Sequence, residues 1–267
     1  YSIFAGTMAD LNYQEIEAAA ARKAPVLFPL AVMEAHGPHL PVATDMYLSY
    51  QFCRALKQAL QERNIESIIA PPFYWGINTS TKVFAGSFAV KPETMTAVLS
   101  ESLECLHDWG FDKIILFNHH GDYLHNKAIL EAVKRSSEKN IGAYFLAPEY
   151  FAKSAKLSGT QPYVLTYPSE TFDLTAKYLD IHAGAVETSA MMKDFPDLVD
   201  EQKARTLPSS RTTLDQFKTW VRDLSAVREI TPQVYLGEPA VIDTDKSRRA
   251  EEQMLKAVLE AIGDIIR

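Results

Sequence analysis

Short apolar runs without a helical period recur along the chain. Residues 26–32 read Val-Leu-Phe-Pro-Leu-Ala-Val, and residues 113–117 read Lys-Ile-Ile-Leu-Phe. Two further runs of the same kind lie at residues 67–70 and 142–146. Continuous apolar runs of this length, partly β-branched, are typical of strands that are buried on both faces of a parallel sheet. The pattern therefore predicts a buried strand at each of these places.

Amphipathic segments separate the predicted strands. Residues 45–63 carry apolar side chains close to helical spacing. Residues 92–109 do the same and begin with a proline, which favours the first position of a helix. Helices are also expected over residues 12–22 and 124–139. Strands that alternate with helices form βαβ units, so the order predicts an α/β fold with a parallel sheet.

Three regions lie outside this alternation. Residues 158–171 are rich in Pro, Ser, Thr and Tyr, and they form either an ordinary surface loop or a lid that excludes water from a nearby site. Residues 201–231 contain a predicted helix with an apolar stripe from Leu214 to Leu224, which we assign to the core or to a subunit interface. A final amphipathic helix over residues 247–267 is expected to pack on the sheet.

The polar residues after the first predicted strand indicate chemistry. Residues 34–45 read Glu-Ala-His-Gly-Pro-His-Leu-Pro-Val-Ala-Thr-Asp. Because residues i and i+2 leave a strand on the same side, Glu34 and His36 can converge. Gly37 and two prolines turn the chain back, which could return Asp45 to the same point. Two carboxylates and an imidazole at a strand end are typical of a metal site. The alternative is a solvated loop in which His36 bonds to a backbone carbonyl.

Two later segments repeat this kind of chemistry. Residues 118–122, Asn-His-His-Gly-Asp, follow another predicted strand, so both clusters lie at carboxyl ends of strands, where α/β folds form their sites. Together they offer enough ligands for two cations that share one bridging carboxylate. The third segment, residues 180–189, contains His182 and places Glu187 on the first turn of a helix. Taken alone, His182 is more typical of an ordinary surface or core histidine.

In combination, these segments make the chain resemble the creatininase (creatinine amidohydrolase) family. That family shows Glu-x-His-Gly-Pro-His-Leu-Pro followed by an Asp, then Asn-Gly-His-Gly-Gly-Asn, then His-Ala-Gly-x-x-Glu-Thr-Ser. Weaker matches are Phe-Ala-Gly-Ser at residues 84–87 and Gly-Glu-Pro at residues 237–239, all in the same order. The resemblance implies a three-layer α/β/α sandwich with a mainly parallel central sheet, as a single domain over residues 1–267. It also implies a homo-oligomer, often a hexamer.

The resemblance further implies a dinuclear metal centre. Glu34 and His120 would bind one ion, His36 would bind the other, and Asp45 would bridge the two. The expected cofactor is two divalent metal ions per chain. Zinc is the first expectation, with manganese or iron as alternatives, because mixed oxygen and nitrogen ligands discriminate poorly among these metals.

The last metal ligand has two candidates. Creatininase itself has a carboxylate two residues after the histidine of the second motif, where this chain has Asp122. Many relatives have glycine there, and a later Glu that matches Glu187 is then the natural substitute. Asp122 is the expected ligand, and Glu187 is expected as a catalytic carboxylate that supports the site or ligates a metal itself. The resemblance places His182 as the catalytic group that moves a proton to the leaving nitrogen.

Residues beside the motifs are expected to shape the substrate pocket. The expected substrate-binding residues are Asn78, Gly121 and Tyr178. Tyr178 lies near the spacing of a substrate-stacking Trp in creatininase and suits a flat substrate. Where many relatives read Gly-x-Ser-x-Glu-His, residues 76–81 read Gly-Ile-Asn-Thr-Ser-Thr, and His119 replaces a usual Gly. Because of these departures, the substrate of a named relative cannot be assigned to this chain.

The implied activity is metal-dependent hydrolysis. Water activated by the dinuclear centre would cleave a non-peptide C–N amide bond, in a cyclic amide or a formamide. Family members open creatinine, deformylate formamidopyrimidines, trim modified peptides or open a cyclic keto-sugar alcohol. One alternative is therefore hydrolysis of a C–C bond in a cyclic ketone, or of an ester bond, on the same metal site. The other is a non-catalytic relative that binds a metal or a small ligand.

The resemblance implies a small-molecule substrate, and composition argues against two other classes of partner. The chain has 27 basic and 34 acidic residues and a net charge of −7, which argues against nucleic acid or an anionic membrane as partner. Cys53 and Cys105 lie in predicted amphipathic helices, and we expect buried thiols rather than a disulfide. No apolar run approaches the roughly 20 residues that cross a bilayer. A cytoplasmic enzyme is expected, although the missing initiator Met leaves a removed leader open.

Overall fold

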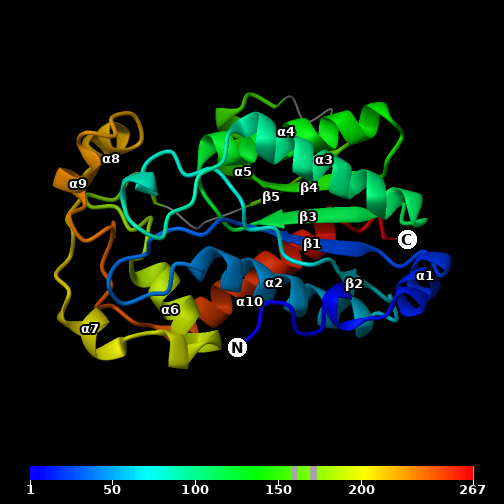
Figure 1. Ribbon diagram of the computed structural model, residues 1–267. Coiled ribbons are helices and arrows are strands. Elements are labelled where there is room, and N and C mark those ends of the chain that lie inside the picture. Colours follow the sequence, from blue (N-terminus) through cyan, green and yellow to red (C-terminus); the bar gives the residue numbers. More distant parts are fainter. Residues whose placement is uncertain (158–160, 169–172, 267) are drawn as a thin grey trace.

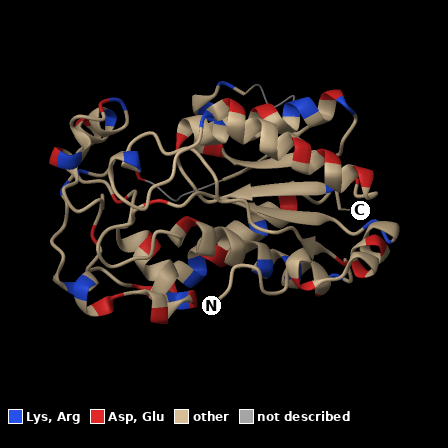
Figure 2. Ribbon diagram, in the orientation of Figure 1, with Lys and Arg blue, Asp and Glu red and all other residues tan. Residues whose placement is uncertain are grey.

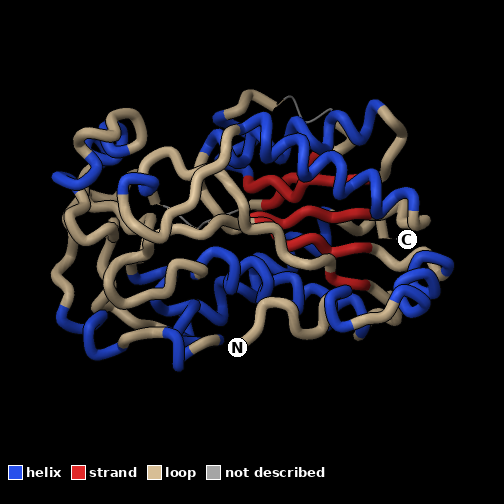
Figure 3. Tube along the Cα trace, viewed as in Figure 1, coloured by secondary structure: helices blue, strands red, loops and turns tan. Residues whose placement is uncertain are grey.

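A parallel sheet forms the centre of the fold. The computed structural model describes residues 1–157, 161–168 and 173–266. Within them the sheet has five strands, all parallel, in the order β2-β1-β3-β4-β5. The strands are β1 (Val26–Leu30), β2 (Ile68–Ile69), β3 (Ile114–Asn118), β4 (Ala143–Pro148) and β5 (Val164–Tyr167). Figures 1 and 3 show helices on both sides of this sheet, which confirms the expected α/β/α sandwich.

Helices connect the strands at the places that the sequence predicts. Pro92 is the first residue of α3, and Asn12 caps α1 through a reciprocal bond with Glu15. The last helix begins before the expected residue 247 and ends before 267. The long helices are α1 (Tyr13–Ala21), α2 (Thr44–Gln61), α3 (Pro92–Asp108), α4 (Tyr123–Glu138), α6 (Ala185–Asp194) and α10 (Thr244–Ala261). The short ones are η1 (Met8–Asp10), η2 (Thr81–Val83), α5 (Glu149–Ser154), η3 (Pro196–Leu198), α7 (Glu201–Thr206), α8 (Leu214–Trp220) and α9 (Val227–Ile230).

The strands divide the core into two apolar layers. Alternate residues of a strand point to opposite faces of the sheet. Phe28 of β1 therefore packs with α3 and α4 on one face, while Leu27 packs with α2 and α10 on the other. In the same way β3 sends Leu116 to the first layer and Phe117 to the second. Burial on both faces explains why these strands read as continuous apolar runs.

The strand β5 corrects one expectation. Residues 158–171 were expected to form a surface loop or a lid, but residues 164–167 of that segment form β5, which pairs with β4. Residues 158–160 and 169–171 lie outside the described residues, so the lid hypothesis has no structural description there. β5 is an edge strand, and only Tyr167 of its side chains is buried, which explains why its sequence lacks the apolar run of the central strands.

The two cysteines also differ from the expectation. Cys53 of α2 is buried, as expected, but Cys105 of α3 is exposed. Both lie on amphipathic helices, and Cys105 falls on the solvent side of its helix, next to the buried stripe that includes Leu103 and Leu106. Both thiols are unpaired.

We expect one thiol per chain to react with the thiol reagent DTNB in the native protein and two after denaturation. Burial raises the pKa of the Cys53 thiol, which suppresses the reactive thiolate, whereas Cys105 is exposed. A Cys105→Ser variant should lose the native reaction and keep one thiol in denaturant. Rapid reaction of two thiols in native wild-type protein would contradict the buried position of Cys53.

The outer surface carries charges of both signs. Figure 2 shows acidic and basic residues spread along the outer helices. In the described part of the chain, no helix is long and apolar enough to cross a membrane. The carboxyl ends of β1 and β3 point to the same edge of the sheet, where long loops gather at the left of Figure 1. Sites of α/β folds form at this edge.

Candidate metal centre

The extension of β1 brings two candidate ligands to the sheet edge. After Leu30 the chain stays extended, with the N–H groups of Ala31 and Met33 bonded to carbonyls of residues 73 and 74. Glu34 and His36 follow at alternate positions, and both are buried. Their positions confirm that the two side chains leave this segment toward a common interior region.

A tight turn then returns the chain to the same region. Gly37 has a φ of +69°, and a Cβ atom there would lie 2.8 Å from the ring of His39, so the turn requires glycine. The N–H of Gly37 bonds to the carbonyl of Val234, which anchors the turn to a distant loop. The chain enters α2 at Thr44, and Asp45 lies buried in the first turn of that helix. The turn therefore returns Asp45 to Glu34 and His36 as the sequence predicts.

The first group of ligand atoms joins Glu34, Asp45 and His120. Nδ1 of His120 lies 2.9 Å from Oδ2 of Asp45 and 3.1 Å from Oε2 of Glu34. The Nε2–H of His120 donates to the carbonyl of Ile77 at 3.0 Å, which leaves Nδ1 as the ligand atom. The hydroxyl of Thr81 donates to Oε1 of Glu34 at 2.5 Å. Two of the three side chains in the group, His120 and Glu34, are thus oriented by a neighbour outside it.

The second group joins His36, Asp45 and Glu187. Nε2 of His36 lies 3.2 Å from Oδ1 of Asp45 and 3.6 Å from Oε2 of Glu187. The Nδ1–H of His36 donates to the carbonyl of Glu34 at 2.8 Å, which leaves Nε2 as the ligand atom. Glu187 comes from the first turn of α6 and accepts the N–H of Ala183 at 2.6 Å. Since its two oxygens face different groups, Asp45 lies between them.

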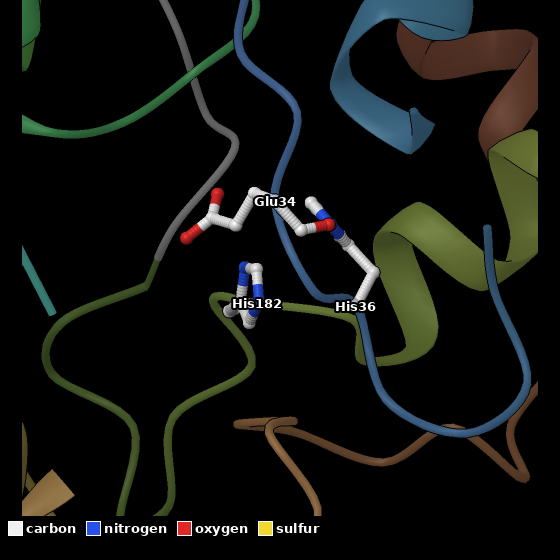
Figure 4. Close-up of side chains that lie close together, drawn as sticks. All are labelled: Glu34, His36 and His182. Carbon is white, nitrogen blue, oxygen red and sulfur yellow. The ribbon is translucent and has the colours of Figure 1, made fainter. Parts of the chain in front are cut away.

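A third histidine borders both groups. The ring of His182 lies 4.2 Å from the ring of His36, measured between centroids. Its Nε2–H donates to the carbonyl of Ala35 at 2.8 Å, and its ligand atoms lie within reach of Glu34 and His36. Figure 4 shows Glu34 and His36 on one segment of chain and His182 reaching them from another. The arrangement brings His182 to the edge of the cluster.

Charge balance explains how carboxylates persist in this buried place. Burial lowers the pKa of His36, but the charge and hydrogen bond of Asp45 and the charges of Glu187 and Glu34 outweigh it and raise this pKa to about 10. Burial also opposes the protonation of His120, and the same kind of carboxylate contacts raise its pKa well above the usual value. In turn, these histidines hold the pKa of Asp45 well below its usual range, against the effect of burial.

The donor set fits divalent cations. In the part of the chain that the structure describes, no Lys or Arg pairs with Glu34, Asp45 or Glu187; their ionic partners are histidines. Buried carboxylates are costly unless they are paired or bind metal. A bound cation would replace the histidine protons, since imidazole and carboxylate bind metals in their deprotonated forms. Mixed nitrogen and oxygen donors suit zinc, manganese or iron.

Asp122 lies apart from these groups. It is the N-cap of α4, and its Oδ1 accepts the N–H groups of Leu124 and His125 at 2.8 and 3.1 Å. Its Oδ2 accepts the N–H of Thr79 at 2.7 Å. Among the described residues, no group of metal-competent side chains includes Asp122, and Glu187 is present instead. The structure therefore places the carboxylate of Asp122 outside the three groups, because a helix begins there and takes the carboxylate as its cap.

The expected substrate-binding residues occupy different environments. Asn78 is buried, and its amide donates to the carbonyls of Met33 and Phe88 at 3.1 and 2.8 Å. Its Oδ1 has no hydrogen-bond partner within the described structure. Gly121 is exposed, with open space around it, and Tyr178 is partly exposed. Substrate binding by Asn78, Gly121 and Tyr178 stays a prediction.

The sequence interpretation missed the residues that orient the ligands. Thr81 holds Glu34, and the carbonyl of Ile77 holds His120. His125 is buried in the first turn of α4, and its Nδ1 accepts the N–H of Ile77 at 3.2 Å. A backbone carbonyl leaves no signal in a sequence. The position of Thr81 in the polar run before residue 82 offered a signal, because buried hydroxyls often bond to ligating carboxylates.

Comparison with known sequences gives matches over most of the chain. A family model named Creatininase, described as creatinine amidohydrolase, matches residues 9–262. The mycofactocin precursor peptide peptidase of Mycobacterium ulcerans (strain Agy99) is 24% identical over 244 residues, which cover 89% of this chain and 84% of the relative. The creatinine amidohydrolase of Pseudomonas putida is 24% identical over 287 aligned residues, covering 100% of this chain and 96% of the relative.

Solved structures share the fold. A crystal structure of creatinine amidohydrolase (creatininase) has a TM-score of 0.71 at 18% identity and covers 98% of both chains. A structure named "Creatininase Mn" has a TM-score of 0.68 at 18% identity, again over 98% of both chains. A mutant creatininase of "Zn-Zn type" has a TM-score of 0.65 at 17% identity, over 100% of this chain and 99% of the other.

Proposed function

The chain belongs to the creatininase family, and on that premise we propose that it hydrolyses a non-peptide C–N amide bond with two divalent metal ions. The observation that carries the proposal is the pair of buried ligand groups that share Asp45. Glu34, Asp45 and His120 would hold one ion, and His36, Asp45 and Glu187 would hold the other. This assignment makes Glu187 the last ligand.

Zinc is the first choice for both ions, with manganese or iron as alternatives. The similar structures include creatininases named with Mn and with Zn-Zn, and the donor set of this chain suits the same metals. When bound, such ions lower the pKa of a coordinated water and polarise a substrate carbonyl. The chain's own part is to hold the ligand atoms in place within a buried, low-dielectric region.

We assign the proton transfer to His182. Because its Nε2–H is committed to the carbonyl of Ala35, Nδ1 is the nitrogen that can accept a proton and deliver it to a leaving nitrogen. Its ring lies beside that of His36, at the edge of the ligand groups. In this proposal His182 acts as the general acid, while Glu187, first expected as a catalytic carboxylate, serves as a ligand.

The substrate is a small molecule with a cyclic amide or a formamide. The similarity to a creatinine amidohydrolase supports a cyclic amide. The similarity to a mycofactocin precursor peptide peptidase supports a second candidate, cleavage of an amide bond in a modified peptide. The two candidates share the metal site and differ in the size and shape of the substrate.

A substrate panel tests the type of bond. Zinc-loaded and manganese-loaded protein would be incubated with cyclic amides, formamides, short peptides and cyclic ketones, and products would be followed by mass spectrometry. We expect turnover of a cyclic amide or a formamide, and its loss in His182→Ala. Turnover confined to peptides would contradict the proposal that the bond is a non-peptide amide, but it would still support a metal-dependent hydrolase. Turnover confined to cyclic ketones would contradict an amidohydrolase, and no turnover at all would favour a non-catalytic relative.

Three further expectations from the sequence are not tested by the structure. They are a single domain over residues 1–267, a cytoplasmic location and a homo-oligomer, hexameric by resemblance. They stay predictions, and light scattering of the purified protein would test the oligomer by giving the mass in solution relative to the 29.9 kDa chain.

A further inference from the structure

One short segment contacts both the α4 helix and two candidate ligands of the first metal group. This segment follows Gly76 and ends at Thr81, the first residue of the η2 turn. We call it the 77–81 segment. At its start, the Ile77 carbonyl accepts the Nε2–H of His120 at 3.0 Å. At its end, the hydroxyl of Thr81 donates to Oε1 of Glu34 at 2.5 Å. The segment thus orients two of the three candidate ligands of one metal ion.

The middle of the segment is held by Asp122. The N–H of Thr79, two residues from each of these contacts, donates to Oδ2 of Asp122 at 2.7 Å. The other oxygen of Asp122 caps α4 through the N–H groups of Leu124 and His125. One carboxylate therefore fastens the 77–81 segment to the helix that begins just after His120.

Close packing limits how far the segment can move at its start. The N–H of Ile77 donates to Nδ1 of His125, a buried histidine of α4. A Cβ atom on Gly76 would lie 2.5 Å from the ring of His125 and 3.0 Å from Cβ of Val32. The backbone thus passes α4 at a distance that only glycine permits. Because the start of the segment is fixed in this way, loss of the bond at Thr79 would be felt at its other end, at Thr81.

We propose that Asp122 is a positioning residue, which holds Glu34 in ligating geometry through Thr79 and Thr81 of the 77–81 segment. The inference rests on the proposed function, since it concerns the affinity of the proposed metal site. Groups that orient ligands typically change metal affinity or activity by about 10- to 100-fold when they are removed. The role differs from that of a ligand, because the number of ions bound stays the same.

The test measures zinc affinity and zinc stoichiometry in matched variants. Asp122→Asn and Asp122→Ser keep an oxygen that caps α4, since Asn, Asp and Ser are comparable N-cap residues. Both lose the acceptor for the N–H of Thr79. Asp243→Asn is the control, because Asp243 caps the surface helix α10 through one backbone N–H. Competition with a chromophoric chelator gives the affinity, elemental analysis gives the stoichiometry, and circular dichroism confirms folding.

We expect Asp122→Asn and Asp122→Ser to bind two zinc ions per chain, one of them about 10- to 100-fold more weakly, while Asp243→Asn matches wild type. Thr81→Val should weaken the same ion, and Thr81→Ser less so, because serine keeps the hydroxyl. In the double variant Asp122→Asn/Thr81→Val the two losses should not add, since both act through one segment.

Three results would overturn the inference. Unchanged affinity in both Asp122 variants would remove the positioning role. Loss of one whole ion would make Asp122 a ligand. Fully additive losses in the double variant would mean that Asp122 and Thr81 act separately. If wild-type protein bound none of zinc, manganese and iron, the proposed function itself would fail. Measuring the wild type first separates that result from the effects of the variants.

Discussion

Replacement of Asp45 by alanine should abolish hydrolysis and release both metal ions. Oδ2 of Asp45 lies 2.9 Å from Nδ1 of His120, and Oδ1 lies 3.2 Å from Nε2 of His36, so one substitution removes a ligand from each group. Metal ions contribute several kcal/mol to transition-state stabilisation, and about 4 kcal/mol corresponds to roughly a thousandfold in rate. We expect kcat/KM for the best panel substrate to fall by at least about a thousandfold.

A matched variant separates loss of a bridge from loss of a single ligand. Glu187→Gln removes a charge from the group that contains His36 and leaves the group of Glu34, Asp45 and His120 intact. It should therefore retain one tightly bound ion and lose the other. Equal metal content in Asp45→Ala and wild type would contradict the bridging position. Equal metal content in Glu187→Gln and wild type would return Asp122 to consideration as the ligand.

Removal of the metal ions should lower the melting temperature of the wild-type protein by about 10 °C. A ligand that binds only the folded state stabilises it by about 4 kcal/mol when its concentration is about 1,000 times Kd. For a chain of this size, each kcal/mol shifts Tm by about 2–4 °C. Differential scanning calorimetry before and after dialysis against a chelator gives the shift, and added zinc or manganese should reverse it.

The control for this stability effect is Asp45→Ala. Without the bridge it should show the same Tm with and without chelator, because no ion remains to be removed. The wild-type protein would first be shown to contain metal before dialysis. If its Tm were then insensitive to the chelator, the ions would lie outside the two buried groups that share Asp45; Figure 4 shows Glu34 and His36 of these groups.

The central fold could be predicted because its signals are local and strong. β1 and β3 are buried on both faces, so their apolar runs have no polar interruption. The edge strand β5 was missed because three of its four side chains remain partly or fully exposed and its sequence lacks such a run. The exposure of Cys105 was missed for a related reason: an amphipathic period predicts a buried face, yet a cysteine beside that face can lie on either side of the boundary.

Most of the candidate site could also be predicted, because its geometry follows from short spacings. Alternate positions bring Glu34 and His36 together, and the Gly-Pro turn returns Asp45 to them. The choice between Asp122 and Glu187 could not be made this way. An aspartate before a helix can point into the site or cap the helix, and only the neighbouring segment, through the N–H of Thr79, decides between these two positions.

The most direct test of the dinuclear site is the metal content of the wild-type protein. The protein would be loaded with zinc, passed through a desalting column and analysed for zinc per chain by elemental analysis. The two groups that share Asp45 predict two equivalents. One equivalent or none, in folded protein, would contradict the dinuclear centre on which the proposed hydrolase rests.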